Sequence, residues 1–390
     1  MDIRQLNLEE RLEALQISAV AFHWMPGDPE KQREELARKP EEDWGAFAED
    51  GRLMAHIINN HFEVHFDGSV VPCGGVGAVS TLPEYRREGA IRKIFARLLP
   101  EAYRRGEVFS ALYPFNHGFY RKAGYETSVW RRDWSFPASV LRGYCFDGAA
   151  EPWRPGLPAE EYTALYGAFA RGFNLAVVRD GARMLGVHLE DDGHHADRRF
   201  AYLLREGSRA VAYVIYRDRP GSDGRVLAVE EAVWDGRAGF EALLGFLARF
   251  SADFGRVELP LPDSVDLYRV IRAEDLYEIG CRPRQGFMAR VVHVERALTL
   301  MCKGPDCDFT LRTEDPWIPE NTGCWHVTAA GAERTEGPAD LTVSLQALSL
   351  MLLGRLTPEE AALRADVEFA GTGVLDGVFT RRPMLVLEDF

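Results

Sequence analysis

The sequence predicts a mixed α/β (α+β) protein with three domains, the second of which repeats the element order of the first. The chain has 390 residues, more than one typical hydrophobic core accommodates. Helices, antiparallel strands and a strand–helix–strand unit follow one another in the first part, which favours a mixed sheet. The same order returns after a Pro/Gly-rich stretch at 148–158, and the pattern changes near Val291. We therefore expect domains at residues 1–150, 151–290 and 291–390.

Periodicity and turn residues order the elements of the first domain. Tight hairpins are expected at Asp50-Gly51 and Asp67-Gly68, because this dipeptide suits a two-residue turn. Apolar residues recur at helical spacing between 91 and 99 and predict a helix with one buried face. The expected elements are a helix at 8–23, a polar helix to about residue 40, antiparallel strands within 46–71, a strand from 76, a helix from 90, and strands at 108–112 and 130–136.

The other two domains are expected to use similar pieces. The second should contain a helix at 160–173, strands at 198–216 and 225–234, a helix at 236–254 and a strand at 257–261. The third should contain a strand–turn–strand over 318–330, preceded by the segment 311–317, then helices at 340–354 and from Thr357, and an extended apolar tail at 382–390.

A turn of sequence Arg86-Arg87-Glu88-Gly89 joins the strand from residue 76 to the next helix. A glycine turn at a helix start points backbone N–H groups outward, where the helix dipole favours an anion. With two arginines added, the turn predicts a phosphate or pyrophosphate ligand. The alternative is an ordinary strand–helix turn with solvated arginines. The second domain has Trp234-Asp235-Gly236-Arg237 at the matching place, so we expect no cofactor there.

The formal net charge of −14 argues against general affinity for nucleic acid or for an anionic membrane. It is compatible with cationic substrates, although acidic surfaces also simply promote solubility. No apolar run approaches the roughly 18 residues of a transmembrane helix. The first residues lack the basic region and cleavage site of a secretory signal. We therefore expect a cytoplasmic protein with neither nucleic-acid nor membrane partners.

The six cysteines are scattered through the chain and do not resemble a disulfide framework. Zinc is the other use of thiolates to weigh, because Cys302, Cys307, Cys324 and His326 lie near one another in the sequence. Their separations do not form the two tight ligand pairs of a zinc finger. We expect reduced structural thiols and no metal.

Several further motifs accompany the turn at 86–89. Val79-Ser80-Thr81 precedes it, and the segment Phe119-Tyr120-Arg121-Lys122-Ala123-Gly124-Tyr125 follows the next strand. The third domain and the chain end add Asp315, Pro316, Pro319, Asn321, Gly323 and Phe390. The turn resembles the acetyl-CoA turn of the GNAT superfamily of N-acetyltransferases. The full combination is similar to the enhanced-intracellular-survival (Eis) acetyltransferases, which have two tandem GNAT-type domains followed by a sterol-carrier-protein-like domain.

The resemblance implies that the cofactor is acetyl-CoA, used as a co-substrate. The implied contacts are backbone at Val79, Ser80 and Thr81 for the pantetheine arm, the turn residues Arg87, Glu88, Gly89, Ala90, Ile91 and Arg92 for the pyrophosphate, and Phe115 and Asn116 after the next strand. Two positions depart from the superfamily pattern. Glu88 places a negative charge in a phosphate-binding turn, so we expect it to point away, and Ile91 replaces a small residue.

Amine attack on a thioester needs a proton acceptor for the amine and a proton donor for the departing thiolate, since an alkyl amine has a pKa of roughly 10. The resemblance implies Tyr120 as general acid and the terminal carboxylate of Phe390 as general base. An α-carboxyl has a pKa of roughly 3.3–3.7 in water, and burial in the apolar tail would raise that pKa. His117, Glu388 and Asp389 are competing base candidates. Without the resemblance, Tyr120 is more simply a packed core tyrosine.

The expected function is an acetyl-CoA-dependent N-acetyltransferase acting on primary amines of cationic small molecules, either aminoglycoside-like or polyamine-like. Phe22, Trp24 and Asp28 are candidates for the substrate pocket. The resemblance also implies a homo-oligomer, with a hexamer as the expected assembly. Two alternatives stay open: an acetyltransferase of protein lysines or N-terminal amines, and a non-catalytic protein that binds acyl-CoA or lipid.

Overall fold

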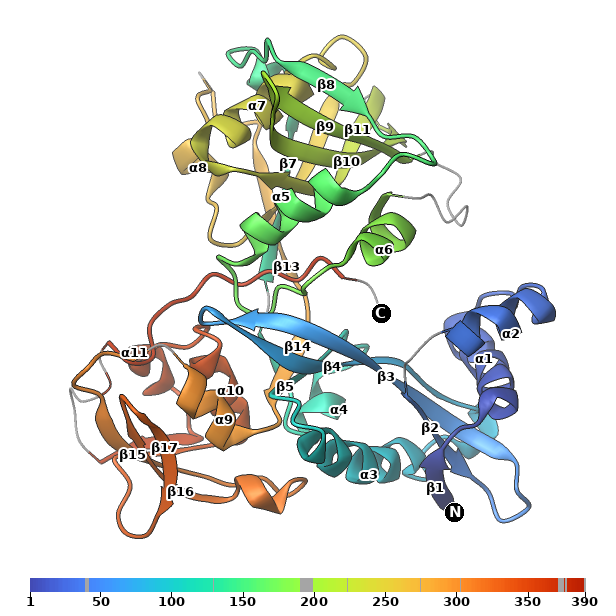
Figure 1. Ribbon diagram of the computed structural model, residues 1–390, viewed down its shortest axis with the longest axis vertical. Coiled ribbons are helices and arrows are strands. Elements are labelled where there is room, and N and C mark those ends of the chain that lie inside the picture. Colours follow the sequence, from blue (N-terminus) through green and yellow to red (C-terminus); the bar gives the residue numbers. More distant parts are fainter. Residues whose placement is uncertain are drawn as a thin grey trace. The chain divides into compact units, whose positions relative to one another are not determined.

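The computed structural model of the chain (Figure 1) describes residues 1–38, 42–128, 130–189, 199–222, 224–273, 275–301, 303–370, 375 and 377–388. The chain divides into two compact units. Unit 1 comprises residues 1–128, 286–382 and 388–390, and unit 2 comprises residues 129–285 and 383–387. Each unit has its own hydrophobic core, and each is described by itself.

Unit 1 contains a seven-stranded mixed sheet in the order β1-β2-β3-β4-β5-β14-β6. Its strands are β1 (Asp2–Gln5), β2 (Glu42–Phe47), β3 (Leu53–Phe66), β4 (Ser69–Thr81), β5 (Phe109–Leu112), β6 (Glu126–Thr127) and β14 (Met288–Val291). Only β4 and β5 pair in parallel among these described strands. Both expected Asp-Gly hairpins are confirmed, with Gly51 and Gly68 at φ of 83° and 85°, a backbone region that glycine enters without steric cost.

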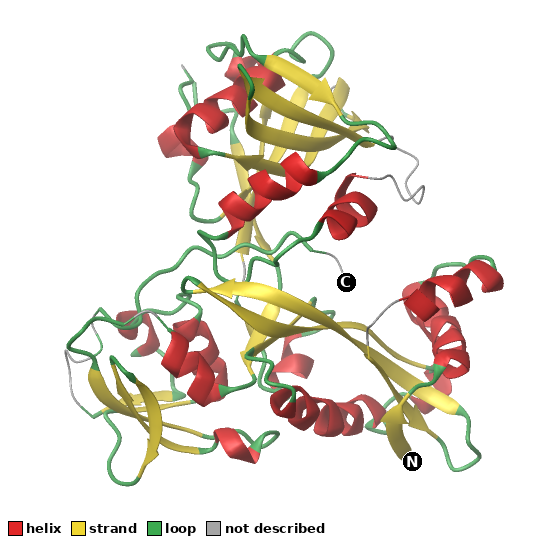
Figure 2. Ribbon diagram, viewed as in Figure 1, coloured by secondary structure: helices red, strands yellow, loops and turns green. Residues whose placement is uncertain are grey.

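The helices that accompany this sheet are α1 (Leu8–Phe22), α2 (Pro29–Arg38), α3 (Ala90–Arg104) and α4 (His117–Arg121). Figure 2 shows α3 lying along one face of the sheet. Its apolar stripe explains this position, since Ile94, Phe95, Leu98 and Leu99 are all buried against the sheet. The helix predicted from residues 91–99 is therefore confirmed.

The third domain belongs to unit 1 and has a five-stranded sheet in the order β17-β16-β15-β18-β19. Its elements are α9 (Val294–Leu300), β15 (Asp308–Thr313), β16 (Gly323–Thr328), β17 (Gly331–Thr335), β18 (Leu341–Val343), α10 (Leu345–Leu352), α11 (Pro358–Ala361) and β19 (Val367–Phe369). The helix expected at 340–354 begins only at Leu345, because residues 341–343 pair with β15 and β19 instead. Ser344 then caps α10.

Unit 2 contains a second seven-stranded sheet in the order β13-β7-β12-β11-β10-β9-β8. Its strands are β7 (Trp130–Pro137), β8 (Ala149–Pro152), β9 (Arg199–Glu206), β10 (Arg209–Gly221), β11 (Gly224–Trp234), β12 (Arg256–Pro262) and β13 (Gly280–Gln285). Its helices are α5 (Glu160–Ala170), α6 (Gly181–Arg183), α7 (Gly236–Ala248) and α8 (Leu267–Val270). Alternate residues of β10 pack with α7 and with α5, so these two helices cover opposite faces.

Two strands lie in a different sheet from the one that their sequence position suggested. β7 was expected before a boundary at residue 150, but it pairs with β12 and β13 and so belongs to unit 2. β14 was not predicted as a strand, and most of its residues fell inside the expected second domain, but it pairs with β5 and β6 in unit 1. A strand belongs to the sheet that satisfies its backbone hydrogen bonds, so the first unit closes at Ser128 and resumes at Gly286.

None of the helices in the described ranges combines the length and the hydropathy that crossing a membrane requires.

Candidate active site

The turn before α3 has the geometry of an anion-binding loop. Arg87 and Gly89 both adopt left-handed backbone conformations, with φ of 72° and 79°. For a residue with a side chain this region costs about 1–3 kcal/mol and is typical of functional loops. Gly89 forms the N-cap of α3 without any side-chain cap, and the first turn contains no acidic residue. The first N–H groups and the positive end of the helix dipole are therefore available to an anion.

Four cationic side chains surround this turn and the adjoining face of α3. In the described part of the chain, none of Arg86, Arg87, Arg92 and Lys122 forms an ion pair, and Glu88, which lies between them, is exposed. Ile91 packs partly buried against the core, so its bulk points into the domain rather than toward the turn. An excess of unpaired positive charge beside an uncapped helix start favours a polyanionic ligand.

The parallel pairing of β4 and β5 ends before this turn. Their parallel pairing runs from Cys73 to Val76 on β4, and among the described residues it goes no farther. β4 bulges at once, with Ala78 at a φ of 49° and a shift of register against β3. The region that follows the last pair of β4 and β5 is called the wedge of unit 1. Backbone groups of the following segment, Val79-Ser80-Thr81, lie beside this wedge without a β5 partner.

A small polar cluster lies under the same segment. Ser80 pairs in register with His56 of β3, and His56 Nε2 lies 2.8 Å from Ser18 Oγ on α1. The His56 Nδ1 atom and the Ser80 hydroxyl are buried and have no hydrogen-bond partner in the described structure. Burial lowers the pKa of His56 to about 4. His56 is therefore neutral at physiological pH and can exchange hydrogen bonds with a bound ligand or water.

Tyr120 lies on α4 and is buried, with 1% of its surface exposed. Its ring makes edge contacts with Phe95, Phe115 and Phe119. Its hydroxyl forms no hydrogen bond with any described residue. Burial, with the neighbouring Tyr125 hydroxyl, raises the pKa of Tyr120 well above its usual range. The phenol is therefore protonated at physiological pH and can donate a hydrogen bond.

The third domain supplies partners for the last carbonyl groups of the segment that holds Tyr120. Gln346 Nε2 donates to the carbonyl of Arg121 at 2.9 Å, and Trp317 Nε1 donates to that of Lys122 at 2.9 Å. Arg290 Nη1, on β14, donates to the carbonyl of Ala123 at 2.6 Å. The carbonyls at a helix end have no partner within the helix. These three side chains therefore hold α4 in place.

Arg290 and Asp315 form a fully buried ion pair at 2.5 Å. Asn321 Nδ2 also donates to Asp315 at 2.9 Å, and the backbone N–H of Trp317 donates to the same carboxylate at 3.0 Å. A glycine is needed at position 124, next to Arg290. A Cβ there would lie 3.1 Å from the Arg290 side chain, and Gly124 has a φ of 85°. The motif residues Asp315 and Asn321 of the third domain thus hold Arg290 and, through it, the loop after α4. They position this loop rather than a reacting group.

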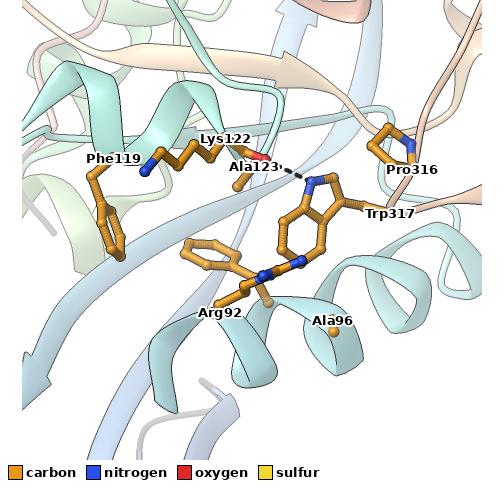
Figure 3. A pocket seen from close by; sticks show the side chains of 8 residues that line it. Arg92, Ala96, Phe119, Lys122, Ala123, Pro316 and Trp317 are labelled. Atoms are coloured by element: carbon orange, nitrogen blue, oxygen red, sulfur yellow. Dashed lines mark hydrogen bonds between the residues drawn. The ribbon is translucent and has the colours of Figure 1, made fainter. Parts of the chain in front are cut away.

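A cavity of about 640 Å³ opens beside α3 and α4. Its lining residues are Arg92, Phe95, Ala96, Phe119, Lys122, Ala123, Pro316 and Trp317. In Figure 3 the guanidinium of Arg92 on α3 points toward the indole of Trp317, which reaches in from the third domain. Three aromatic side chains and two cations on one cavity are suited to a nucleotide that carries phosphate.

The C-terminal segment returns to unit 1 at Glu388, which is fully buried. Its carbonyl accepts a hydrogen bond of 2.9 Å from the hydroxyl of Tyr113, the residue directly after β5. Glu388 thus lies next to the strand that borders the wedge of unit 1. The proposed base Phe390 and its competitor Asp389 lie outside the described residues.

The other predicted residues fall at or near these elements. Asn116 caps α4 by accepting a hydrogen bond from the N–H of Phe119, and Phe115 is 68% exposed. His117 Nε2 is buried without a partner among the described residues. Phe22 and Trp24 are exposed at the end of α1, and Asp28 accepts hydrogen bonds from backbone N–H groups at the start of α2.

The candidate zinc ligands that the structure describes do not form a cluster. Cys302 lies outside the described residues, Cys307 and Cys324 are buried free thiols, and His326 Nε2 pairs with Asp308 at 2.8 Å. No cluster of metal-ligating side chains occurs within the described ranges.

Sequence reasoning missed Tyr113, Lys122 and Trp317 as site residues. Lys122 was visible within the motif at 119–125, and Trp317 follows the quoted Asp315-Pro316. Neither the cavity nor the contact with Glu388 leaves a sequence signal, because both join segments that are distant in the chain.

Comparisons with family models agree with the predicted order of domains. Residues 2–128 and 175–291 each match a model described as an acetyltransferase (GNAT) domain, and residues 294–386 match a sterol carrier protein domain. A sequence search among curated proteins gives no match at the significance required.

Similar solved structures extend over the whole chain. A GCN5-related N-acetyltransferase from Anabaena variabilis superposes with a TM-score of 0.86 at 20% identity, with 100% of both chains covered. A probable N-acyltransferase from Enterococcus faecalis gives 0.86 at 22% identity, with 100% and 99% covered. Eis1 from Mycobacterium abscessus gives 0.84 at 21% identity, with 100% of both chains covered. These likenesses show a common fold.

Proposed function

We propose that this chain, which carries two GNAT-type acetyltransferase domains followed by a sterol carrier protein domain, transfers the acetyl group of acetyl-CoA to a primary amine of a cationic small molecule. Aminoglycoside-like or polyamine-like acceptors fit the net charge of −14. The observation that carries the proposal is the pairing of an uncapped, cation-rich helix start with a buried phenol that has no hydrogen bond among the described residues.

The proposed cofactor contacts follow from the elements of unit 1. The turn at 87–92 holds the pyrophosphate, and backbone groups of Val79, Ser80 and Thr81 meet the pantetheine arm in the wedge of unit 1. The cavity of Figure 3 receives the adenosine end, with Phe119 and Trp317 against the base. The family resemblance assigns Arg92 to the pyrophosphate, and we assign the 3′-phosphate to Lys122, the other cation that lines this cavity.

Two groups of the chain move protons in the proposed reaction. The amine nitrogen forms a bond to the thioester carbon, and the carbon–sulfur bond breaks. Tyr120 gives its phenolic proton to the departing thiolate, and the terminal carboxylate of Phe390 accepts the proton of the amine, directly or through water. The Tyr113 contact supports this base, because it ties Glu388, two residues earlier, beside β5.

Thiol release from acetyl-CoA tests the reaction with four acceptors: a polyamine, an aminoglycoside, a lysine peptide and a peptide with a free N-terminus. We expect turnover with one of the first two. Preference for a peptide would support the protein-acetylating alternative, and no release with any acceptor would support a binding protein.

Two pairs of variants test the proton carriers. Tyr120→Phe should lower kcat by about 100-fold or more, whereas Tyr103→Phe, on the far end of α3, should not. A few residues appended after Phe390 should abolish turnover and leave acetyl-CoA binding intact, whereas Phe390→Ala keeps a terminal carboxylate and should keep turnover. Full activity of the extended chain would exclude the carboxylate as base.

A further inference from the structure

Unit 2 has a cavity at the place in its fold that corresponds to the cavity of Figure 3 in unit 1. β11 and β12 form the only parallel pair among the described strands of their sheet, as β4 and β5 do in theirs. α7 joins β11 to β12 as α3 joins β4 to β5, and α8 follows β12 as α4 follows β5. The cavity of unit 1 lies beside α3 and α4, and that of unit 2 lies beside α7 and α8. The latter is called the α7–α8 cavity.

The α7–α8 cavity combines aromatic rings with guanidinium groups. It measures about 450 Å³, which is within the usual range for small-molecule sites. Its lining residues all belong to unit 2: Tyr144, Trp234, Gly236, Arg237, Phe240, Glu241, Val265, Val270 and Arg272. The rings of Trp234 and Phe240 have their centroids 5.0 Å apart, and both side chains are half-buried, so part of each ring stays accessible. They offer flat apolar surface to a ligand that has a ring of its own.

Tyr144 holds Arg272 beside this cavity. The backbone N–H of Arg272 donates to the hydroxyl of Tyr144 at 2.7 Å, and the Arg272 guanidinium lies over the Tyr144 ring, 4.7 Å from its centroid. Tyr144 is buried and belongs to the hydrophobic core of unit 2. Arg272 is thus attached to a rigid residue, which reduces the conformational entropy that it loses when it holds a ligand.

The cavity keeps an excess of positive charge. Oε1 of Glu241 lies 3.0 Å from Nε of Arg237 and 3.8 Å from Nη2 of Arg272. In the described part of the chain the two arginines form no other ion pair, and two positive charges with one negative charge leave one positive charge. The neighbouring Asp235 does not line the cavity and pairs with Arg209. The cavity therefore suits an anion rather than a cation.

The turn that would bind a diphosphate is missing from unit 2. Trp234-Asp235-Gly236-Arg237 stands where unit 1 has Arg86-Arg87-Glu88-Gly89. Acetyl-CoA would lack in unit 2 the contacts that the proposed function gives to its pyrophosphate. A ligand with a single phosphate group needs none of them.

We propose that the α7–α8 cavity binds a nucleoside monophosphate, with its base against Trp234 and Phe240. The phosphate takes its place between Arg237 and Arg272, which already converge on one carboxylate oxygen. Guanidinium groups bind phosphate oxygens through charge-assisted hydrogen bonds, often in pairs. The site lies within unit 2 and does not depend on the proposed function.

Calorimetric titration of the full chain with AMP, adenosine and inorganic phosphate tests this site. AMP should bind about tenfold or more tightly than either of the other two, because it alone uses both the rings and the guanidinium groups. Hydrogen exchange locates the ligand, since AMP should slow the exchange of amides in 236–241 and 265–272. Phosphate that binds as tightly as AMP, or adenosine that does so, would overturn the proposal.

Three variants at exposed positions test the charges. Arg272→Glu should weaken AMP binding about tenfold or more. Glu241→Gln releases both guanidinium groups from their carboxylate and should tighten AMP binding about threefold. Arg269→Glu makes the same charge change on α8, at a side chain that does not line the cavity, and should leave AMP binding unchanged. Weaker binding in Glu241→Gln, or equal losses in Arg272→Glu and Arg269→Glu, would contradict the assignment.

A variant of unit 1 separates this site from the proposed acetyl-CoA site. AMP resembles the adenosine end of acetyl-CoA and can therefore bind in unit 1 as well, where Arg92→Glu should weaken it. The slowed exchange at 236–241 should persist in Arg92→Glu and disappear in Arg272→Glu. The reverse pattern would assign AMP to unit 1 alone and overturn the proposal. If no amine is acetylated, the proposed function fails, but these measurements still decide on unit 2 because they require no turnover.

Discussion

The hydroxyl of Tyr113 donates a hydrogen bond of 2.9 Å to the backbone carbonyl of Glu388, a residue 275 positions later in the chain. Tyr113 directly follows β5, the strand that borders the wedge of unit 1. This contact ties Glu388 to the domain that carries Tyr120. A catalytic role for the terminal carboxylate depends on such a tie, because an untethered tail would spend little time near the acid.

Tyr113→Phe should therefore lower kcat more than it lowers affinity. Removing one hydrogen bond of this kind costs about 1 kcal/mol, which corresponds to roughly fivefold in the population of the held tail. We expect kcat to fall by that factor and the acetyl-CoA dissociation constant to stay unchanged. Steady-state kinetics and calorimetric titration of acetyl-CoA measure the two quantities. An equal loss in both would indicate that Tyr113 serves the cofactor instead.

Arg87→Gly should move stability and cofactor affinity in opposite directions. Glycine relieves the left-handed strain at φ of 72°, so the melting temperature should stay equal or rise. The variant loses a guanidinium beside the proposed pyrophosphate, and KM for acetyl-CoA should increase about tenfold. Arg87→Lys is the control, since it keeps both the charge and the strain. Unchanged KM in Arg87→Gly would mean that backbone groups alone hold the anion.

Lys122→Ala should weaken the binding of acetyl-CoA and leave the binding of its 3′-dephospho analogue unchanged. If the ammonium of Lys122 meets the 3′-phosphate, KM for acetyl-CoA should rise about tenfold, the value of one charge-assisted hydrogen bond. The analogue lacks the phosphate, so its KM should be the same for the wild type and the variant. A rise with both compounds would place Lys122 against another part of the cofactor.

His56 should make the protein less stable in mild acid. Its pKa is about 4 in the folded chain, because burial disfavours the charged ring, and about 6.5 when unfolded. The unfolded state therefore binds the proton first, and unfolding becomes easier as the pH falls from about 6.5 to about 4. The free energy of unfolding loses up to about 3 kcal/mol from this group over that range.

His56→Gln should remove this part of the pH dependence, since glutamine does not titrate. Urea unfolding of both chains at pH 7, 5.5 and 4 measures the effect. The stability difference between the variant and the wild type should shift in favour of the variant at low pH. Ser18→Ala, which leaves the imidazole buried, should keep the wild-type slope. Parallel curves for His56→Gln and the wild type would contradict the argument.

Local sequence patterns predicted most of the secondary structure, because the residues within each of these elements determine its conformation. The Asp-Gly hairpins, the amphipathic face of α3 and the Thr357 capping box are determined within a few residues. The exception is 341–343, where pairing with β15 overrides an apolar pattern that also fits a helix. The mixed sheets and the duplication followed from the order of the elements.

The parts of the site that join distant segments could not be predicted in the same way. Nothing near Trp317 indicates that its indole meets the carbonyl of Lys122. The residues Asp315 and Asn321 were recognised as a motif, but only the structure relates them to Arg290 as a buried network. Long-range contacts depend on the folded path of the whole chain, which a local pattern does not encode.

The placement of β14 has a consequence for how the protein is made. The sheet of unit 1 includes this strand between β5 and β6, so it cannot be completed until residue 291 has been synthesised. At 5–20 residues per second, the roughly 180 residues after β5 take about 10 to 40 s to emerge. For that time the first acetyltransferase domain on the ribosome has an open strand edge next to β5. A shortened gene that ends near residue 128 would make this transient state permanent, and we expect its product to aggregate.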